Sequence, residues 1–137
     1  MTRAALATAG VVLALAVTPA AQTDRPPFYT CVEGTTPVEA PLVGVELCDA
    51  APTDALLARA VEDNLQVVSG ALVVAADPDG VGATEGLQAG DVIYQVAAVG
   101  VTTAEAAAER LEAIVAERDT VANFLRGGRP YRVKLRR

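Results

Sequence analysis

The chain has 137 residues, of which 52% are hydrophobic and only 4% aromatic. This length allows one domain together with an export segment, and the hydrophobic content is too high for an intrinsically disordered chain. The 17 acidic residues outnumber the 11 basic ones, which argues against a nucleic-acid partner. The sequence contains no histidine, so neither a Ser-His-Asp nor a Cys-His catalytic arrangement can be assembled.

Residues 1–21 are typical of a signal peptide. Arg3 provides the positive charge, an apolar stretch follows, and residues 18–21 combine a helix-breaking proline with small side chains. A membrane anchor is the alternative, but the uninterrupted apolar run is shorter than the ~20 residues that a membrane span requires. We therefore expect export to the periplasm or secretion, with cleavage after Ala20 or Ala21.

Residues 22–39 form a leader segment that precedes the main domain. In an oxidising compartment, Cys31 and Cys48 are expected to form a disulfide, and two free buried thiols are the alternative. The spacing does not match a redox Cys-x-x-Cys motif, and two cysteines without histidine do not complete a typical zinc site. Tethered in this way, the leader could cover a binding groove or add a strand of its own.

Helical spacing predicts a short helix over residues 53–61, capped by Thr53 or Asp54. Its apolar positions are Leu56, Leu57, Ala60 and Val61. An apolar strand is expected at residues 71–76, followed by a turn-rich loop at 77–86 and a second strand at 92–96.

A longer helix is predicted over residues 103–118. Thr102 and Glu105 have the spacing of a capping box at its start. One face of this helix carries Ala104, Ala107, Ala108, Leu111 and Val115. A hairpin follows, in which residues 120–126 and 130–135 pair across Gly127 and Gly128, because glycine readily adopts the positive φ of tight turns.

Residues 86–93 read Gly-Leu-Gln-Ala-Gly-Asp-Val-Ile, and this run resembles a motif of bacterial PDZ domains. Asp91 can accept hydrogen bonds from backbone N–H groups just before the apolar strand. The Arg126-Gly-Gly turn is similar to the Arg-x-Gly that closes such domains, and the resemblance extends over residues 40–136. It implies an α+β fold for residues 40–137, namely a PDZ-like, partly open β-barrel or sandwich of five or six strands with two helices.

The resemblance also implies a peptide-binding groove, in which a ligand pairs as an antiparallel strand with one strand of the domain. A nest of backbone N–H groups at the start of that strand would hold the ligand carboxylate. Carried over to this chain, the nest is Leu42, Val43 and Gly44, the pairing strand is Val45, Glu46 and Leu47, and the helix wall is Ala104, Ala108 and Leu111.

These features predict an exported, non-enzymatic adaptor that recognises protein C-termini or extended segments and needs no metal or cofactor. The alternative is a structural or assembly subunit of an envelope or secretion complex that uses its sheet edge or its basic C-terminal hairpin. That hairpin could contact an anionic membrane peripherally, or its charges could be paired with acids elsewhere in the fold. Its basic residues are Arg126, Arg129, Arg132, Lys134, Arg136 and Arg137.

Overall fold

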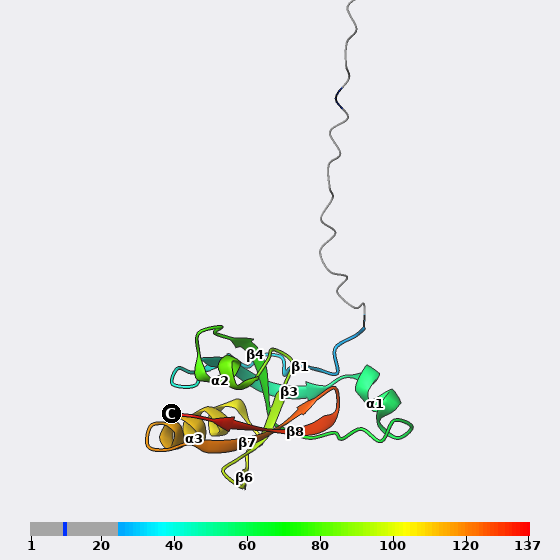
Figure 1. Cartoon of the computed structure of the whole chain (residues 1–137). Helices are drawn as coiled ribbons and strands as arrows, with labels where there is room; N and C mark the ends of the chain where they lie inside the picture. The colour runs from blue at the N-terminus through cyan, green and yellow to red at the C-terminus, as the bar shows by residue number, and fades with distance from the viewer. Residues whose placement is uncertain (1–9, 11–24) are drawn as a thin grey trace, which may run out of the picture.

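The structure is a computed structural model that describes residue 10 and residues 25–137 (Figure 1). The expected signal peptide, residues 1–21, lies outside the described residues except for Gly10. No helix within the described part of the chain is long and apolar enough to cross a membrane.

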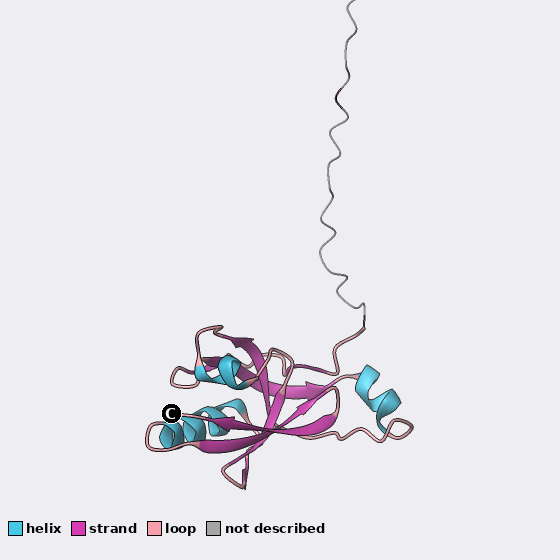
Figure 2. Ribbon diagram, in the orientation of Figure 1, coloured by secondary structure: helices cyan, strands magenta, loops and turns pink. Residues whose placement is uncertain are grey.

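Residues 25–137 form eight strands and three helices (Figures 1 and 2). In chain order these are β1 (Tyr29–Cys31), β2 (Val38–Ala40), β3 (Val45–Pro52), α1 (Asp54–Ala60), β4 (Ala71–Ala76), α2 (Val81–Glu85), β5 (Val92–Val96), β6 (Val99–Gly100), α3 (Ala104–Val115), β7 (Thr120–Arg126) and β8 (Arg129–Leu135).

The strands form one antiparallel sheet in the order β1-β3-β4-β5-β7-β8, in which β2 pairs with β3 and β6 pairs with β5. This confirms the α+β class. Residues 41–137 contain six strands, as expected, and three helices rather than two, because part of the loop at 77–86 closes into α2. The leader adds β1 and β2 to the sheet.

The main core lies between the sheet and α3. The five expected residues on the inner face of α3 are all buried, and they pack with apolar residues of β3, β4, β5 and β7. Alanines at three of these positions let the helix approach the sheet closely. Figure 2 shows α3 beside the sheet, at the opposite end from α1.

A second, smaller core includes Tyr29, Cys48, Leu56 and Leu125. The expected helix is present, but of its four apolar positions only Leu56 is buried, whereas Leu57 and Val61 are 52% and 90% exposed. The helix is too short to bury a wider stripe. Thr53 does occupy the N-cap position, but its hydroxyl donates to the Pro27 carbonyl and accepts no helical N–H.

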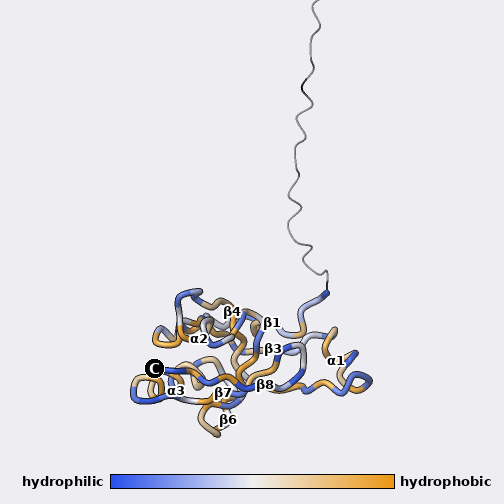
Figure 3. Tube along the Cα trace, in the orientation of Figure 1, coloured by the Kyte–Doolittle hydropathy of each residue, from blue (hydrophilic) through white to orange (hydrophobic). Residues whose placement is uncertain are grey.

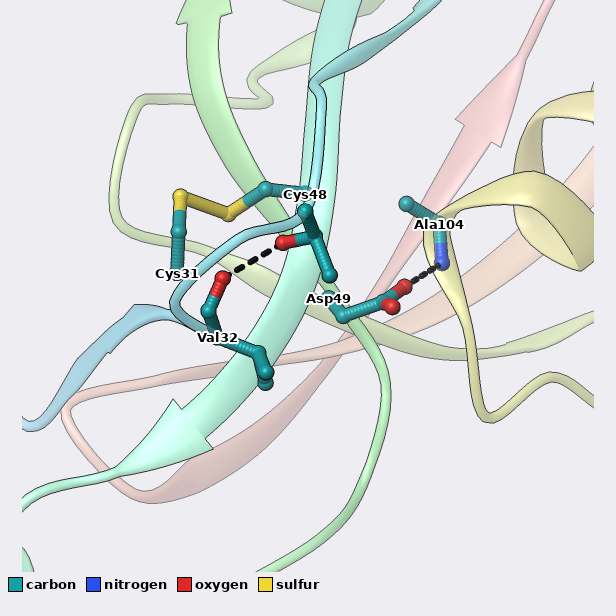
Figure 4. Close-up of a disulfide and its surroundings, with 6 residues drawn as sticks. Cys31, Val32, Cys48, Asp49 and Ala104 are labelled. Atoms are coloured by element: carbon teal, nitrogen blue, oxygen red, sulfur yellow. Dashed lines mark hydrogen bonds between the residues drawn. A yellow bond between two sulfur atoms is a disulfide. The ribbon is translucent and has the colours of Figure 1, made fainter.

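The start of α3 differs by one residue from the expected capping box. Thr103, rather than Thr102, is the N-cap residue, and its hydroxyl accepts a hydrogen bond from the Ala106 N–H. The Asp49 carboxylate accepts the Ala104 N–H at 2.7 Å (Figure 4). A strand residue therefore supplies the second cap, which local sequence spacing does not reveal.

The turn between β5 and β6 is built from Ala97 and Ala98, whose φ angles are 47° and 65°. Two-residue hairpin turns of type I′ need positive φ at both central positions, for which Asn-Gly is the usual pair. Arg110 donates to the carbonyls of Val96 and Ala97 and holds this turn against α3. The turn therefore stores backbone strain that the surrounding contacts offset.

Asp91 is buried, and its carboxylate accepts the Gln88 N–H, as the sequence predicts. Arg126 donates to both carboxylate oxygens at 2.8 Å and also to the Gly86 carbonyl. The hydrogen bonds to Asp91 raise the pKa of Arg126, so the guanidinium stays charged. This bidentate pair connects the loop before β5 to the end of β7.

Several cations of the C-terminal hairpin have acidic neighbours. Lys134 lies 3.9 Å from Asp119 and Arg136 lies 3.9 Å from Glu85. The backbone N–H of Arg137 donates to Asp119, whereas its guanidinium donates to the Glu117 carbonyl. Figure 3 shows this end of the chain as hydrophilic. Together with Arg126, which pairs with Asp91, three of the six basic residues thus lie near acids of the fold, which agrees in part with the expectation that these charges are paired.

We predict that Arg126→Gln lowers the free energy of unfolding by about 2–3 kcal/mol, because it leaves the buried Asp91 carboxylate without its cation. The cost stays below that of a fully buried pair, since the Arg126 side chain is 39% exposed. The matched control is Lys134→Gln, which removes an exposed pair and should cost less than about 1 kcal/mol. Urea unfolding compares the two variants, and equal losses would contradict the assigned role of Arg126.

We predict that replacing Ala97-Ala98 by Asn-Gly raises the free energy of unfolding by about 1–2 kcal/mol, because Asn and Gly adopt positive φ with less strain. Ala106→Gly is the control, because this exposed position is helical and the same kind of change should cost about 0.5–1 kcal/mol there. Thermal and urea unfolding measure both effects. A destabilised Asn-Gly variant would show that the alanine turn is not strained.

Candidate functional site

The candidate groove lies between the outer edge of β3 and the inner face of α3. One edge of β3 pairs with β4, and residues 41–44 lead into the strand. Asp49 holds the N-terminus of α3 to β3, and Arg110 holds the middle of the helix to the β5–β6 turn. Together with the packing of its inner face in the main core, these two contacts position α3 beside β3.

The structure brings the predicted site residues together. Most of them belong to the main core: Val43, Val45, Leu47, Ala104, Ala108 and Leu111. Leu42 is half exposed and Glu46 is partly exposed on the opposite face of the strand. Their role in peptide binding stays a prediction.

The outer edge of β3 is occupied by the leader. On this edge β2 pairs antiparallel with the first residues of β3, and β1 pairs with the last. Val38 lies opposite Leu47 and Ala40 lies opposite Val45, with both leader side chains packed in the main core. The position expected for a ligand strand is thus filled by the chain itself.

The three N–H groups of the predicted nest all have partners. The N–H groups of Val43 and Gly44 donate to the Ala40 carbonyl at 3.1 and 2.8 Å. The Leu42 N–H donates to the Glu112 carboxylate at 2.8 Å. A backbone carbonyl and a side-chain carboxylate therefore share the contacts that a ligand carboxylate would make.

Gly44 is required by packing and backbone conformation. Its φ is 76°, and a Cβ atom there would lie 3.0 Å from the Gly80 Cα. The expected reason was close approach of a ligand carboxylate, but the neighbour that restricts this position is the loop before α2. A substitution at Gly44 would therefore disturb the fold as well as the groove.

The leader is anchored at two further points. A disulfide joins Cys31 of β1 to Cys48 of β3, as predicted (Figure 4). Tyr29 is buried in the second core, and its hydroxyl accepts the Val68 N–H. Burial raises the pKa of Tyr29, and the hydrogen bond from Val68 partly opposes this rise. The phenol thus stays neutral near neutral pH and suits an apolar anchor.

The sequence left open whether the leader covers the groove or adds a strand, and the structure shows that it adds β2 on the edge of β3. Sequence reasoning missed the exact pairing of β2 and the roles of Glu112 and Asp49. The leader strands have three residues each, too few to show a strand pattern. Glu112 lies 70 residues from Leu42 and Asp49 lies 55 from Ala104, so neither contact has a local signal.

A second groove, of about 870 Å³, lies between the leader, α1 and the β7–β8 turn. Phe28, Leu65 and Leu125 contribute apolar surface, and Arg25 and Arg129 are among the basic residues that line it. None of the predicted site residues lies there.

No protein-family model and no curated protein matches the chain. Several solved structures are similar in fold. The crystal structure of the HtrA3 PDZ domain bound to a phage-derived ligand (FGRWV) has 21% sequence identity and a TM-score of 0.52, and the match covers 69% of this chain and 82% of that chain. The HtrA-type protease AlgW with decapeptide has 21% identity and a TM-score of 0.53, with 69% of this chain covered but only 27% of that chain.

Both matches span most of the described residues. The first is a PDZ domain, and the second is a region of a larger protease. At this level of identity the likeness concerns the fold alone. The PDZ-like fold expected from the Gly86–Ile93 motif agrees with this likeness. The chain has a PDZ-like fold.

Proposed function

We propose that this protein is an exported, non-enzymatic adaptor that binds an extended peptide segment by strand addition to β3. The observation that carries the proposal is the position of β2. This strand lies antiparallel on the edge of β3 away from β4, packs against α3 and directs its last carbonyl to two N–H groups of residues 41–44. The groove therefore has the dimensions and the hydrogen-bonding groups to hold a peptide strand.

The similar structures support the same proposal, since the HtrA3 domain carries a phage-derived ligand and AlgW carries a decapeptide. The disulfide and the predicted signal peptide support export, because disulfides persist in oxidising compartments. The C-terminal hairpin, in which Arg126, Lys134 and Arg136 lie near acids of the fold, gives no specific support to the alternative of an assembly subunit.

A peptide must displace β2 before it binds. The leader is tethered on one side by residues 41–44 and on the other by the disulfide, so it competes at an effective concentration of roughly millimolar or higher. The resting protein is thus self-occupied, and binding depends on how easily β2 leaves the edge of β3.

The geometry favours extended segments over free C-termini. The resident strand continues past Ala40 into Pro41, and its amide carbonyl satisfies the two N–H groups. The third N–H belongs to Leu42, and the Glu112 carboxylate already accepts it. A terminal carboxylate placed there would be repelled by Glu112, whereas an amide carbonyl would not.

We predict that loosening the leader increases peptide affinity. The variant Cys31→Ser/Val38→Gly removes the disulfide and the apolar anchor of β2, and leaves the buried Cys48 in place. The probe is a labelled peptide of residues 35–40, Thr-Thr-Pro-Val-Glu-Ala, with an amidated end. Losing the Val38 contacts weakens the binding of β2 to β3 by about 1.5 kcal/mol. The affinity for the peptide, measured by fluorescence anisotropy, should therefore rise about tenfold.

The matched control is Cys31→Ser/Val61→Gly, which changes the same residue types but trims a 90% exposed side chain. This control should bind the labelled peptide much more weakly than the first variant does. Circular dichroism establishes that both variants fold. Absence of binding to every folded variant would overturn the proposed function.

We predict that Glu112→Gln creates a preference for free-acid peptides. In the loosened variant with Glu112 intact, free-acid and amidated peptides should bind with similar affinity, because Glu112 repels the added charge. Glutamine keeps a hydrogen-bond acceptor for Leu42 and removes that charge, so the free acid should gain about three- to tenfold. Glu109→Gln, on the exposed face of α3, is the control. A strong free-acid preference with Glu112 intact would contradict this role.

A further inference from the structure

The pairing of β2 with β3 contains one unfavourable contact. Glu39 lies directly opposite Glu46 in the antiparallel register, on the face away from the main core. Like charges at directly opposite positions destabilise a strand pair. Val38 and Ala40 of β2 thus pack favourably against β3, whereas Glu39 between them faces a like charge.

The surroundings of this pair are acidic. A surface groove of about 420 Å³ runs beside it, and its lining includes Glu39, Glu46 and Asp77. The other lining residues are Pro41, Gly44, Val45, Ala75 and Ala76, so the groove contains no cation to neutralise the carboxylates. A basic side chain in place of Glu39 would replace the repulsion by attraction.

The inner face of the strand has different requirements. Ala40 is fully buried and Val38 packs against the same core. Both positions are enclosed by the β3 edge and by α3, whose inner face is rich in alanine. A larger residue at the Ala40 position would overpack this site, whereas a β-branched residue suits the Val38 position.

We infer that the groove selects extended segments of the pattern Val/Ile-Lys/Arg-Ala, and that β2, with Glu39 at the central position, is a resident occupant that such a segment displaces. This inference rests on the proposed function and names the class of ligand for the same site. It follows from the register of β2, since the central residue of any strand bound in this way faces Glu46.

The test uses the loosened variant Cys31→Ser/Val38→Gly and three amidated peptides. The reference is Thr-Thr-Pro-Val-Glu-Ala, the second peptide has Lys in place of Glu, and the third has Lys at the centre and Leu at the end. At about 50 mM salt the Lys peptide should bind about five- to tenfold more tightly than the reference, and the advantage should shrink at about 500 mM salt. The Leu-ended peptide should lose most of this gain.

Reversing the charge of Glu46 tests whether this residue causes the preference for the Lys peptide. Adding Glu46→Lys should invert the preference, so that the Glu peptide binds more tightly than the Lys peptide. Adding Glu62→Lys, at an exposed position in the turn after α1, changes the net charge equally and should leave the preference unchanged. Inversion by both variants would point to a general charge effect and overturn the inference.

A second measurement needs no ligand. In the otherwise unchanged protein, Glu39→Lys should strengthen the resident strand and slow amide hydrogen exchange in β2 by about fivefold or more. If peptides bind with equal affinity whatever their central charge, the inference fails and the proposed function stands. If no peptide binds while all variants are folded, the proposed function fails.

Discussion

The structure depends on how the outer edge of β3 satisfies its backbone groups. A buried strand cannot leave its N–H and C=O groups unpaired without a large free-energy cost. In this protein the leader provides the partners, with β2 on the first half of the strand and β1 on the second. The same pairing protects an edge that would otherwise be open to other chains.

The pairing of the leader with β3 also affects the candidate site. Ala40 directs its carbonyl to Val43 and Gly44, and Glu112 takes the remaining N–H of the loop, at Leu42. The predicted binding groups are therefore already engaged. Under the proposed function, peptide binding depends on competition between β2 and the peptide for one edge of β3, and small differences in strand pairing decide the outcome.

The leader is held unevenly along its length. Tyr29 and the disulfide anchor β1 in and beside the second core. β2 has no covalent anchor of its own: Val38 and Ala40 pack in the main core, but Glu39 faces Glu46 across the pair. Opening at β2 therefore costs less than unfolding the domain, since the second core and the Asp91–Arg126 pair remain in place.

The sequence by itself determined the parts of the fold whose signals are local. The period of α3 predicted its buried face, the glycines at 127 and 128 predicted the last hairpin, and the Gly86–Ile93 run predicted the loop before β5 and the hydrogen bond of Asp91. Only the tertiary structure decided which segment lies on the edge of β3, because β2 is too short to show a strand pattern. The hydrogen bond between Leu42 and Glu112 joins residues 70 positions apart, so it has no local signal either. The same holds for the Ala97-Ala98 turn, where positive φ is imposed by contacts to neighbouring strands and to Arg110 rather than by the residues that adopt it.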